Sequence, residues 1–165
     1  MLHISGVNYE SIADAPGVCC VIFVSGCKHE CEGCHSPKTH DFHYGLPATD
    51  ELIESINVEI RKRPYLSGLV LSGGDPMYSA KEVNDLLDKL VIPNNRIWCF
   101  TGFRFEQLLQ NTEQRKLLER IEVLVDGPFV QNKRDVTLSY RGSRNQRLID
   151  VKEALNQHRI IIYQG

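Results

Sequence analysis

Three cysteines crowd one short segment of the chain, Cys27, Cys31 and Cys34, with the spacing CxxxCxxC. Thiolates are soft ligands that favour zinc and iron–sulfur clusters over hard cations. Three thiolates hold three irons of a cubane cluster and leave the fourth iron open for a non-protein ligand, as a reactive site requires. The spacing therefore predicts a [4Fe-4S] cluster with three cysteine ligands. The other cysteines lie inside apolar runs and are expected in the core; they are Cys19, Cys20 and Cys99.

A zinc site is the competing interpretation of this segment. Structural zinc usually takes four Cys or His ligands as two separated pairs, and the sequence has no second CxxC. A fourth ligand is nevertheless at hand among the neighbouring histidines, which are His29, His35, His40 and His43. Local spacing favours the cluster and leaves a zinc-binding, non-enzymatic module as the alternative.

The composition is that of a single globular domain. The chain has 165 residues, so we expect one domain over residues 1–165. A hydrophobic content of 42% is ordinary, and a formal net charge of −2 provides no basic field that would attract nucleic acid. Residues 1–11 do not resemble a signal peptide, and the longest apolar stretch, residues 18–24, is too short to span a membrane. We therefore expect a cytoplasmic protein with no membrane and no direct nucleic-acid partner.

Strand-like and helix-like segments alternate around the cysteines. Apolar runs predict strands over residues 18–24, 68–71, 96–100 and 121–125. Helical spacing predicts helices over residues 50–62, 79–90 and 105–120. This rhythm predicts an α/β fold with a mostly parallel sheet, and a complete barrel needs about 250 residues, so we expect a partial βα barrel. The last third is expected to be looped, with one late strand over residues 159–163.

A glycine-rich turn, Ser-Gly-Gly-Asp-Pro at residues 72–76, follows the second predicted strand. The carboxyl ends of parallel strands meet at one edge of a sheet, so this turn and the cysteine segment should lie together. Glycines let main-chain groups approach a small ligand closely. Alone the motif is ordinary turn chemistry. Beside the cysteines it is a candidate ligand site, and the next two strand ends, at residues 101–102 and 126–129, should face it as well.

The cysteine spacing after an apolar strand resembles the signature of the radical S-adenosylmethionine enzymes. The sequence of residues 23–35 is similar to that of one branch, the activating enzymes of anaerobic ribonucleoside-triphosphate reductase. It has Gly33 where most of the superfamily carries an aromatic residue. Residues 126–129 and the Arg-Gly-Ser-Arg-Asn-Gln-Arg segment at 141–147 look like further parts of that branch. Asp-Ala-Pro-Gly at residues 14–17 resembles the Asp-Gly-Pro-Gly of glycyl-radical activases and departs from it at Ala15.

This resemblance implies a fold of the radical S-adenosylmethionine type and a reaction. A [4Fe-4S] cluster would cleave S-adenosylmethionine reductively, and the 5′-deoxyadenosyl radical would take hydrogen from a glycine of the reductase. The implied electron donor is a flavodoxin or ferredoxin, and no side-chain acid or base is required. The Gly-Gly pair would contact the amino group of the methionine moiety, and the arginine segment would hold a carboxylate of the cofactor or of the partner. The implied cofactor-binding positions are Gly33, Cys34, His35, Gly73, Gly74, Asp75 and Asp126.

An alternative within the same chemistry is activation of another glycyl-radical enzyme, such as pyruvate formate-lyase, or small-molecule radical chemistry. Gly33, the late Arg-Gly-Ser segment and the short chain argue against both.

Overall fold

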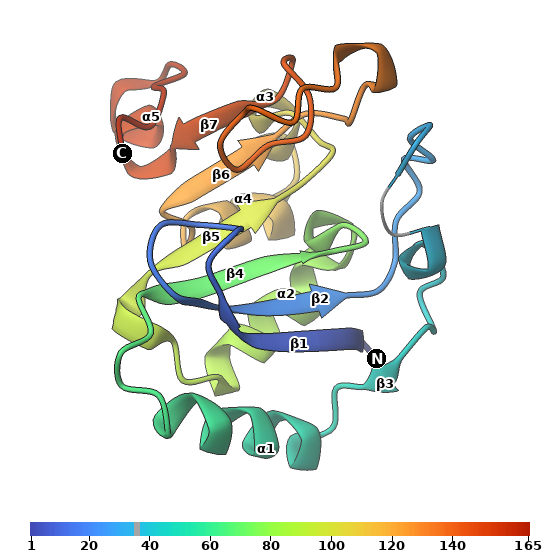
Figure 1. Ribbon diagram of the computed structural model, residues 1–165, viewed down its shortest axis with the longest axis vertical. Coiled ribbons are helices and arrows are strands. Elements are labelled where there is room, and N and C mark those ends of the chain that lie inside the picture. The colour runs from blue at the N-terminus through green and yellow to red at the C-terminus, as the bar shows by residue number, and fades with distance from the viewer. Residues whose placement is uncertain (35–36) are drawn as a thin grey trace.

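A seven-stranded sheet runs through the molecule in the computed structural model, which describes residues 1–34 and 37–165 (Figure 1). The strands are β1 (His3–Ser11), β2 (Cys19–Val24), β3 (Leu46–Pro47), β4 (Gly68–Gly73), β5 (Ile97–Phe100), β6 (Val123–Asp126) and β7 (Arg147–Asp150). The α-helices are α1 (Asp50–Arg61), α2 (Ala80–Lys89), α3 (Phe105–Leu108), α4 (Thr112–Leu118) and α5 (Val151–Gln157). In this part of the chain, none of the helices combines the length and apolarity that crossing a bilayer requires.

The strand order is β3-β1-β2-β4-β5-β6-β7. The central strands β2, β4, β5 and β6 pair in parallel, whereas β1, β3 and β7 join them antiparallel. The prediction of a mixed α/β fold with a parallel central sheet is therefore confirmed. The parallel strands bring the loops that follow them to one edge, and there the last residue of β2, Val24, lies beside Gly73 at the end of β4.

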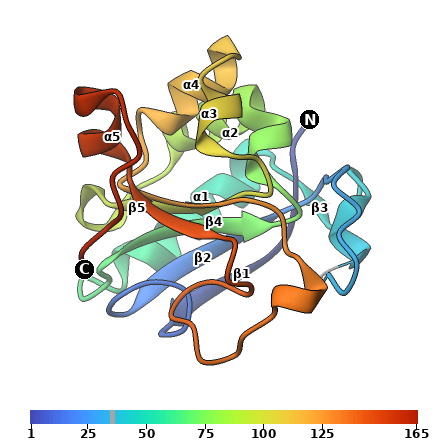
Figure 2. The ribbon, with the colours of Figure 1, turned by 90° about the horizontal axis from the view of Figure 1, so that it is seen from above.

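The two faces of the sheet have different covers. Strand β2 shows this directly, because Cys20 and Ile22 belong to the main apolar cluster, which also holds the buried side chains of the helices, while Cys19 and Val21 belong to a second cluster. Alternation of side chains along a strand produces this division. Helices cover one face, and the loops at residues 12–18 and 127–146 lie on the other (Figure 2). The strand predicted over residues 18–24 is therefore confirmed as β2, and it is covered on both faces.

Helix α1 is capped at its start by Thr49. The Thr49 side chain accepts a hydrogen bond from the backbone N–H of Leu52 at 3.2 Å, which satisfies one of the free donors at the helix start. Its apolar face, which includes Ile53, Ile56 and Ile60, is buried. Helix α2 and strands β4, β5 and β6 also lie where the sequence places them, within a few residues at each end.

The prediction of a single helix over residues 105–120 is wrong. The segment forms two helices, α3 and α4, because Asn111 begins a new one: its side chain accepts from the backbone N–H of Gln114 at 3.0 Å. An asparagine that bonds the backbone in this way competes with continuation of the preceding helix.

The late strand over residues 159–163 is also wrong, since that segment makes one isolated bridge, between Ile162 and Ile149 of β7. Regular structure comes earlier in the last third, as β7 and α5. The Asp150 side chain caps α5 by accepting from the backbone N–H of Glu153 at 3.2 Å. Residues 134–146 form neither helix nor strand, and the pairing recorded there is a bridge between Arg134 and Ser143.

Candidate active site at the carboxyl edge of the parallel strands

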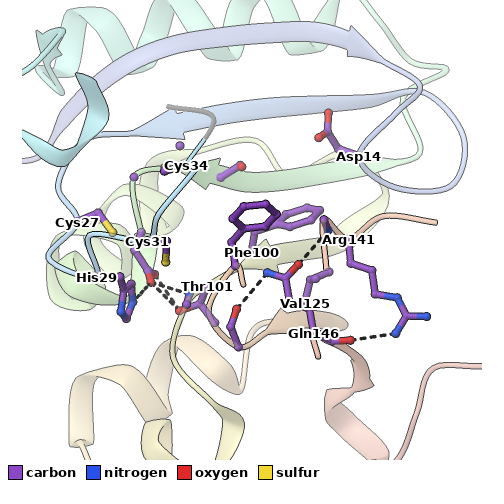
Figure 3. A pocket seen from close by; sticks show the side chains of 18 of the residues that line it. Asp14, Cys27, His29, Cys31, Cys34, Phe100, Thr101, Val125, Arg141 and Gln146 are labelled. Atoms are coloured by element: carbon purple, nitrogen blue, oxygen red, sulfur yellow. Dashed lines mark hydrogen bonds and ion pairs between the residues drawn. The ribbon is translucent and has the colours of Figure 1, made fainter. Parts of the chain in front are cut away.

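A cavity of about 430 Å³ lies at the carboxyl edge of the parallel strands. Its walls come from the loop after β2, the turn after β4, the ends of β5 and β6, and the segment around residues 138–146. The cysteines lie at one end of it and Arg141 at the other (Figure 3). Segments distant in sequence thus meet in one space at the edge that the parallel topology predicts.

All three cysteines of the CxxxCxxC segment line this cavity as free, partly exposed thiols. Burial raises the pKa of Cys27 to about 11, while the backbone N–H of His29 bonds to it and opposes the rise. An uncomplexed Cys27 is therefore a protonated thiol at neutral pH, and a metal must displace its proton on binding. The remaining cysteines are buried in the sheet, as expected; they are Cys19, Cys20 and Cys99.

The glycine turn is tied to the start of the cysteine loop. The backbone N–H of Gly74 donates to the carbonyl of Val24 at 2.8 Å, and that of Asp75 donates to the carbonyl of Gly26 at 2.9 Å. Gly73 has φ +105°, and a Cβ at either glycine would collide with neighbouring main-chain atoms. Neither glycine has room for a side chain, so at these two positions the cavity is lined by main-chain groups.

Asp75 is a buried tie between three loops. Its carboxylate accepts from Thr101 Oγ1 at 2.9 and 3.0 Å, from the backbone N–H of Gly102 at 2.8 Å and from that of Met77 at 2.9 Å. It also accepts from His29 Nε2 at 2.6 Å. Asp75 is one of the residues that line the cavity, and these donors already fill most of the acceptor capacity of its carboxylate.

Asp126 points away from the cavity. Its neighbours Val125 and Gly127 line the cavity, but its own buried carboxylate accepts from Arg147 Nε and Nη2 at 3.0 and 2.6 Å. It also accepts from the backbone N–H of Phe105 at 2.8 Å, at the start of α3. The Asp126 side chain therefore lies on the helix-covered face of the sheet, where it binds Arg147 and the start of α3.

Gly33 allows a close approach of the late segment to the cysteine loop. Its φ is +77°, and a Cβ there would collide with the side-chain oxygen of Gln131 and lie 3.3 Å from the Phe129 ring. A larger residue here would have to displace the Gln131 side chain and adopt a left-handed backbone conformation, which favours the glycine noted in the sequence. His35, the next predicted position, lies outside the described residues.

The late arginine segment supplies the other end of the cavity. Arg141 donates through Nη1 to the Gln146 carbonyl at 2.9 Å, and its buried Nε has no hydrogen-bond partner in residues 1–34 and 37–165. Gln146 holds the loop, accepting from Gly142 at 2.9 Å and donating to the Gly127 carbonyl at 3.1 Å. Gln146 belongs to the segment at residues 141–147 that the sequence singled out, whereas the cavity-lining Tyr140 carried no such signal.

The donor set fits an iron–sulfur cluster better than a single ion. The tightest group of possible ligand atoms in the described chain is Cys27, His29 and Asp75, which lie within 4.8 Å of one another. Two of these, however, are occupied with each other through a 2.6 Å hydrogen bond. Three thiols spread along one wall suit a cluster, which is wider than an ion, and the side-chain-free glycine turn leaves space beside it.

Comparison with known proteins agrees with this donor set. The family model described as a 4Fe-4S single cluster domain matches residues 13–149. A protein of Escherichia coli (strain K12) is 41% identical over 145 residues, covering 82% of this chain and 90% of that protein. One of Vibrio cholerae is 39% identical over 140 residues, covering 82% and 89%.

A relative from Enterobacteria phage T4 is 33% identical over 161 residues, covering 92% of this chain and 99% of that protein. All three carry the name anaerobic ribonucleoside-triphosphate reductase-activating protein. Matches of this extent and identity show the family. The chain belongs to the anaerobic ribonucleoside-triphosphate reductase-activating proteins and contains a 4Fe-4S single cluster domain.

Proposed function

We propose that this chain generates a glycyl radical on anaerobic ribonucleoside-triphosphate reductase, using S-adenosylmethionine and a [4Fe-4S] cluster held by Cys27, Cys31 and Cys34. One observation carries the proposal: three free thiols and a side-chain-free glycine turn line the same cavity. The names of the relatives support the choice of partner.

Three thiolates leave one iron available to the amino and carboxylate groups of the cofactor. When bound, the reduced cluster supplies the electron that splits S-adenosylmethionine into methionine and the 5′-deoxyadenosyl radical, which takes hydrogen from the partner's glycine. This chain's residues then have only to bind, orient and shield. A flavodoxin or ferredoxin is our proposed electron donor, because reducing a sulfonium needs a low-potential source.

The glycine turn is our proposed contact for the methionine amino group, through the main chain of Gly73 and Gly74. Asp75 acts on the cofactor by fixing that turn, because most of its acceptor sites are filled by protein donors. Asp126 supports the fold behind the cavity, through Arg147 and the start of α3, and in our proposal does not contact the cofactor. Gly33 provides clearance beside Cys34, and a cofactor contact of His35 stays a prediction.

We propose that the open sheet is an incomplete βα barrel whose uncovered side admits a loop of the partner protein. Two strongly exposed aliphatic residues adjoin the cavity wall, Ile12 at 79% and Val136 at 82% exposure. They stand one and two positions from the lining residues Ala13 and Leu138. Apolar surface beside a reactive cavity suits a protein substrate. Reduced thiols also fit our proposed cytoplasmic location.

Metal analysis and product formation test this proposal together. Anaerobically reconstituted protein should contain four irons and four sulfides per chain, by the definition of the cluster, and should form 5′-deoxyadenosine with reductant and S-adenosylmethionine. The Cys34→Ser variant should do neither. Colourless protein with stoichiometric zinc and no 5′-deoxyadenosine would refute the proposal in favour of a zinc module.

A further inference from the structure

Within the described residues, His29 is the member of the cysteine loop whose side chain is recorded in a hydrogen bond to the glycine turn. It stands two positions after Cys27 and two before Cys31. Its Nε2 lies 2.6 Å from Asp75 Oδ2, and its side chain is 16% exposed. Because carboxylate oxygens accept hydrogen bonds, Nε2 carries the proton and donates it. This bond joins residues 46 positions apart.

The His29 ring is enclosed as well as bonded. It packs against Tyr78 with ring centroids 4.9 Å apart and against Phe103 at 4.7 Å. A Cβ on Gly102 would lie 2.6 Å from the ring carbon Cδ2, so only glycine at that position leaves the ring its place. One orientation is therefore imposed by packing from the ends of both β4 and β5.

The same residue also contacts the first cysteine. The backbone N–H of His29 bonds to the Cys27 sulfur, while its side chain bonds to Asp75. Asp75 in turn accepts hydrogen bonds from the Thr101 hydroxyl and from the backbone N–H of Gly102. The chain of contacts runs from a thiol, through one residue, to the buried carboxylate that follows the Gly-Gly pair.

We propose that His29 is a positioning residue: its bond to Asp75 fixes the cysteine loop, and with it the open iron, relative to the main chain of Gly73 and Gly74. The inference rests on the proposed function, because it concerns how S-adenosylmethionine is held between those two elements. Loss of the bond lets the loop shift while the thiols stay on it. Cofactor binding should suffer, and cluster assembly should not.

Two substitutions separate the bond from the packing. His29→Phe keeps an aromatic ring against Tyr78 and Phe103 but cannot donate to Asp75. His29→Gln restores a donor near the place of Nε2. His43→Phe is the matched control, because that histidine belongs to the same region and its side chain is 85% exposed.

Each protein is reconstituted anaerobically, and iron and sulfide are counted per chain. The Kd of S-adenosylmethionine is then measured per cluster, and the electron paramagnetic resonance spectrum of the reduced cluster is recorded with and without the cofactor. We expect His29→Phe to keep its cluster and to raise the Kd about tenfold to a hundredfold, as loss of a residue supporting a metal ligand does. The spectral change on cofactor addition should shrink, His29→Gln should recover most of both, and His43→Phe should match the wild type.

The proposal is overturned if His29→Phe matches the wild type in Kd and spectrum, or if His29→Gln is as impaired as His29→Phe. Cofactor binding that falls only in proportion to iron content assigns His29 to loop stability and also overturns it. If His29→Phe alone fails to assemble a cluster, Gly102→Ala, which displaces the ring without altering His29, is judged by the same criteria. Failure of the wild type itself to bind the cluster or cofactor would instead refute the proposed function.

Discussion

Replacing Arg147 with methionine should destabilise the fold strongly, because it removes the charged partner of a buried carboxylate. The Asp126 side chain is 1% exposed and receives two of its three hydrogen bonds from this guanidinium. Breaking a buried ion pair by removing one partner costs about 3–5 kcal/mol. With a urea dependence of about 2 kcal/mol per molar, the unfolding midpoint should fall by about 1.5–2.5 M.

The reverse substitution, Asp126→Asn, should cost less, about 1–3 kcal/mol. The remaining Arg147 is 28% exposed and still pairs with Glu106 at 2.7 Å, so its charge is not stranded. The double variant should be more stable than the sum of the single losses predicts, by about 1 kcal/mol or more, since both charges then leave together.

The assay is urea unfolding followed by far-ultraviolet circular dichroism, with every variant in the same reduced, cluster-free state. Cofactor affinity is measured separately on the reconstituted proteins. The reasoning predicts a large stability loss for Arg147→Met and, per cluster, an unchanged Kd of S-adenosylmethionine for Asp126→Asn. A loss below about 1 kcal/mol for Arg147→Met, or a tenfold weaker cofactor in an otherwise stable Asp126→Asn, would show that the carboxylate faces the ligand instead.

Three further outcomes follow from the geometry. Gly73→Ala should lose both cofactor binding and stability, because the new Cβ would collide with main-chain atoms. Gly127→Ala should cost only about 1–2 kcal/mol of backbone strain, because its φ is +94° but the nearest atom to a Cβ is 3.8 Å away. Urea unfolding and cofactor titration compare the two variants. Cys34→Ser should abolish the iron content and Cys99→Ala should keep it, as iron analysis will show. The hydrogen bond from the Arg147 guanidinium lowers the pKa of the Glu106 carboxyl from 4.5. The ionised Glu106 therefore stabilises the folded state fully above pH 4.5, and this stabilisation is lost as the pH falls through the lowered pKa. Glu106→Gln should flatten this part of the curve of unfolding free energy against pH.

The parallel core of the fold was predictable because its strands are continuous apolar runs bounded by turn residues. Strand β1 was not, since it is polar along much of its length and its pairing with β2 has two register shifts. The break at Asn111 depended on whether one side chain bonded its own backbone, which periodicity does not reveal. Strand β7 is stabilised by its place beside β6, and its local sequence favours no strand.

The meeting of the cysteine loop and the glycine turn follows from topology, so the sequence could predict it. The direction of the Asp126 side chain follows from alternation along β6. Val125 faces the loop-covered side of the sheet, so the next side chain points toward the helices. The bond between His29 and Asp75 had no such signal, because it joins loops after different strands. From its spacing alone, His29 was as readily a zinc ligand as a residue that bonds the cysteine loop to the glycine turn.

One spectrum tests the central claim directly. The reconstituted protein is mixed anaerobically with a low-potential reductant, S-adenosylmethionine and anaerobic ribonucleoside-triphosphate reductase, and the electron paramagnetic resonance spectrum is recorded. We predict a radical doublet on the reductase, split by the one remaining glycine α-hydrogen, that collapses when the reductase carries α-deuterated glycine and is absent with Cys34→Ser. Absence of the radical from a sample that contains the full cluster, or a radical of equal intensity with Cys34→Ser, would contradict the account.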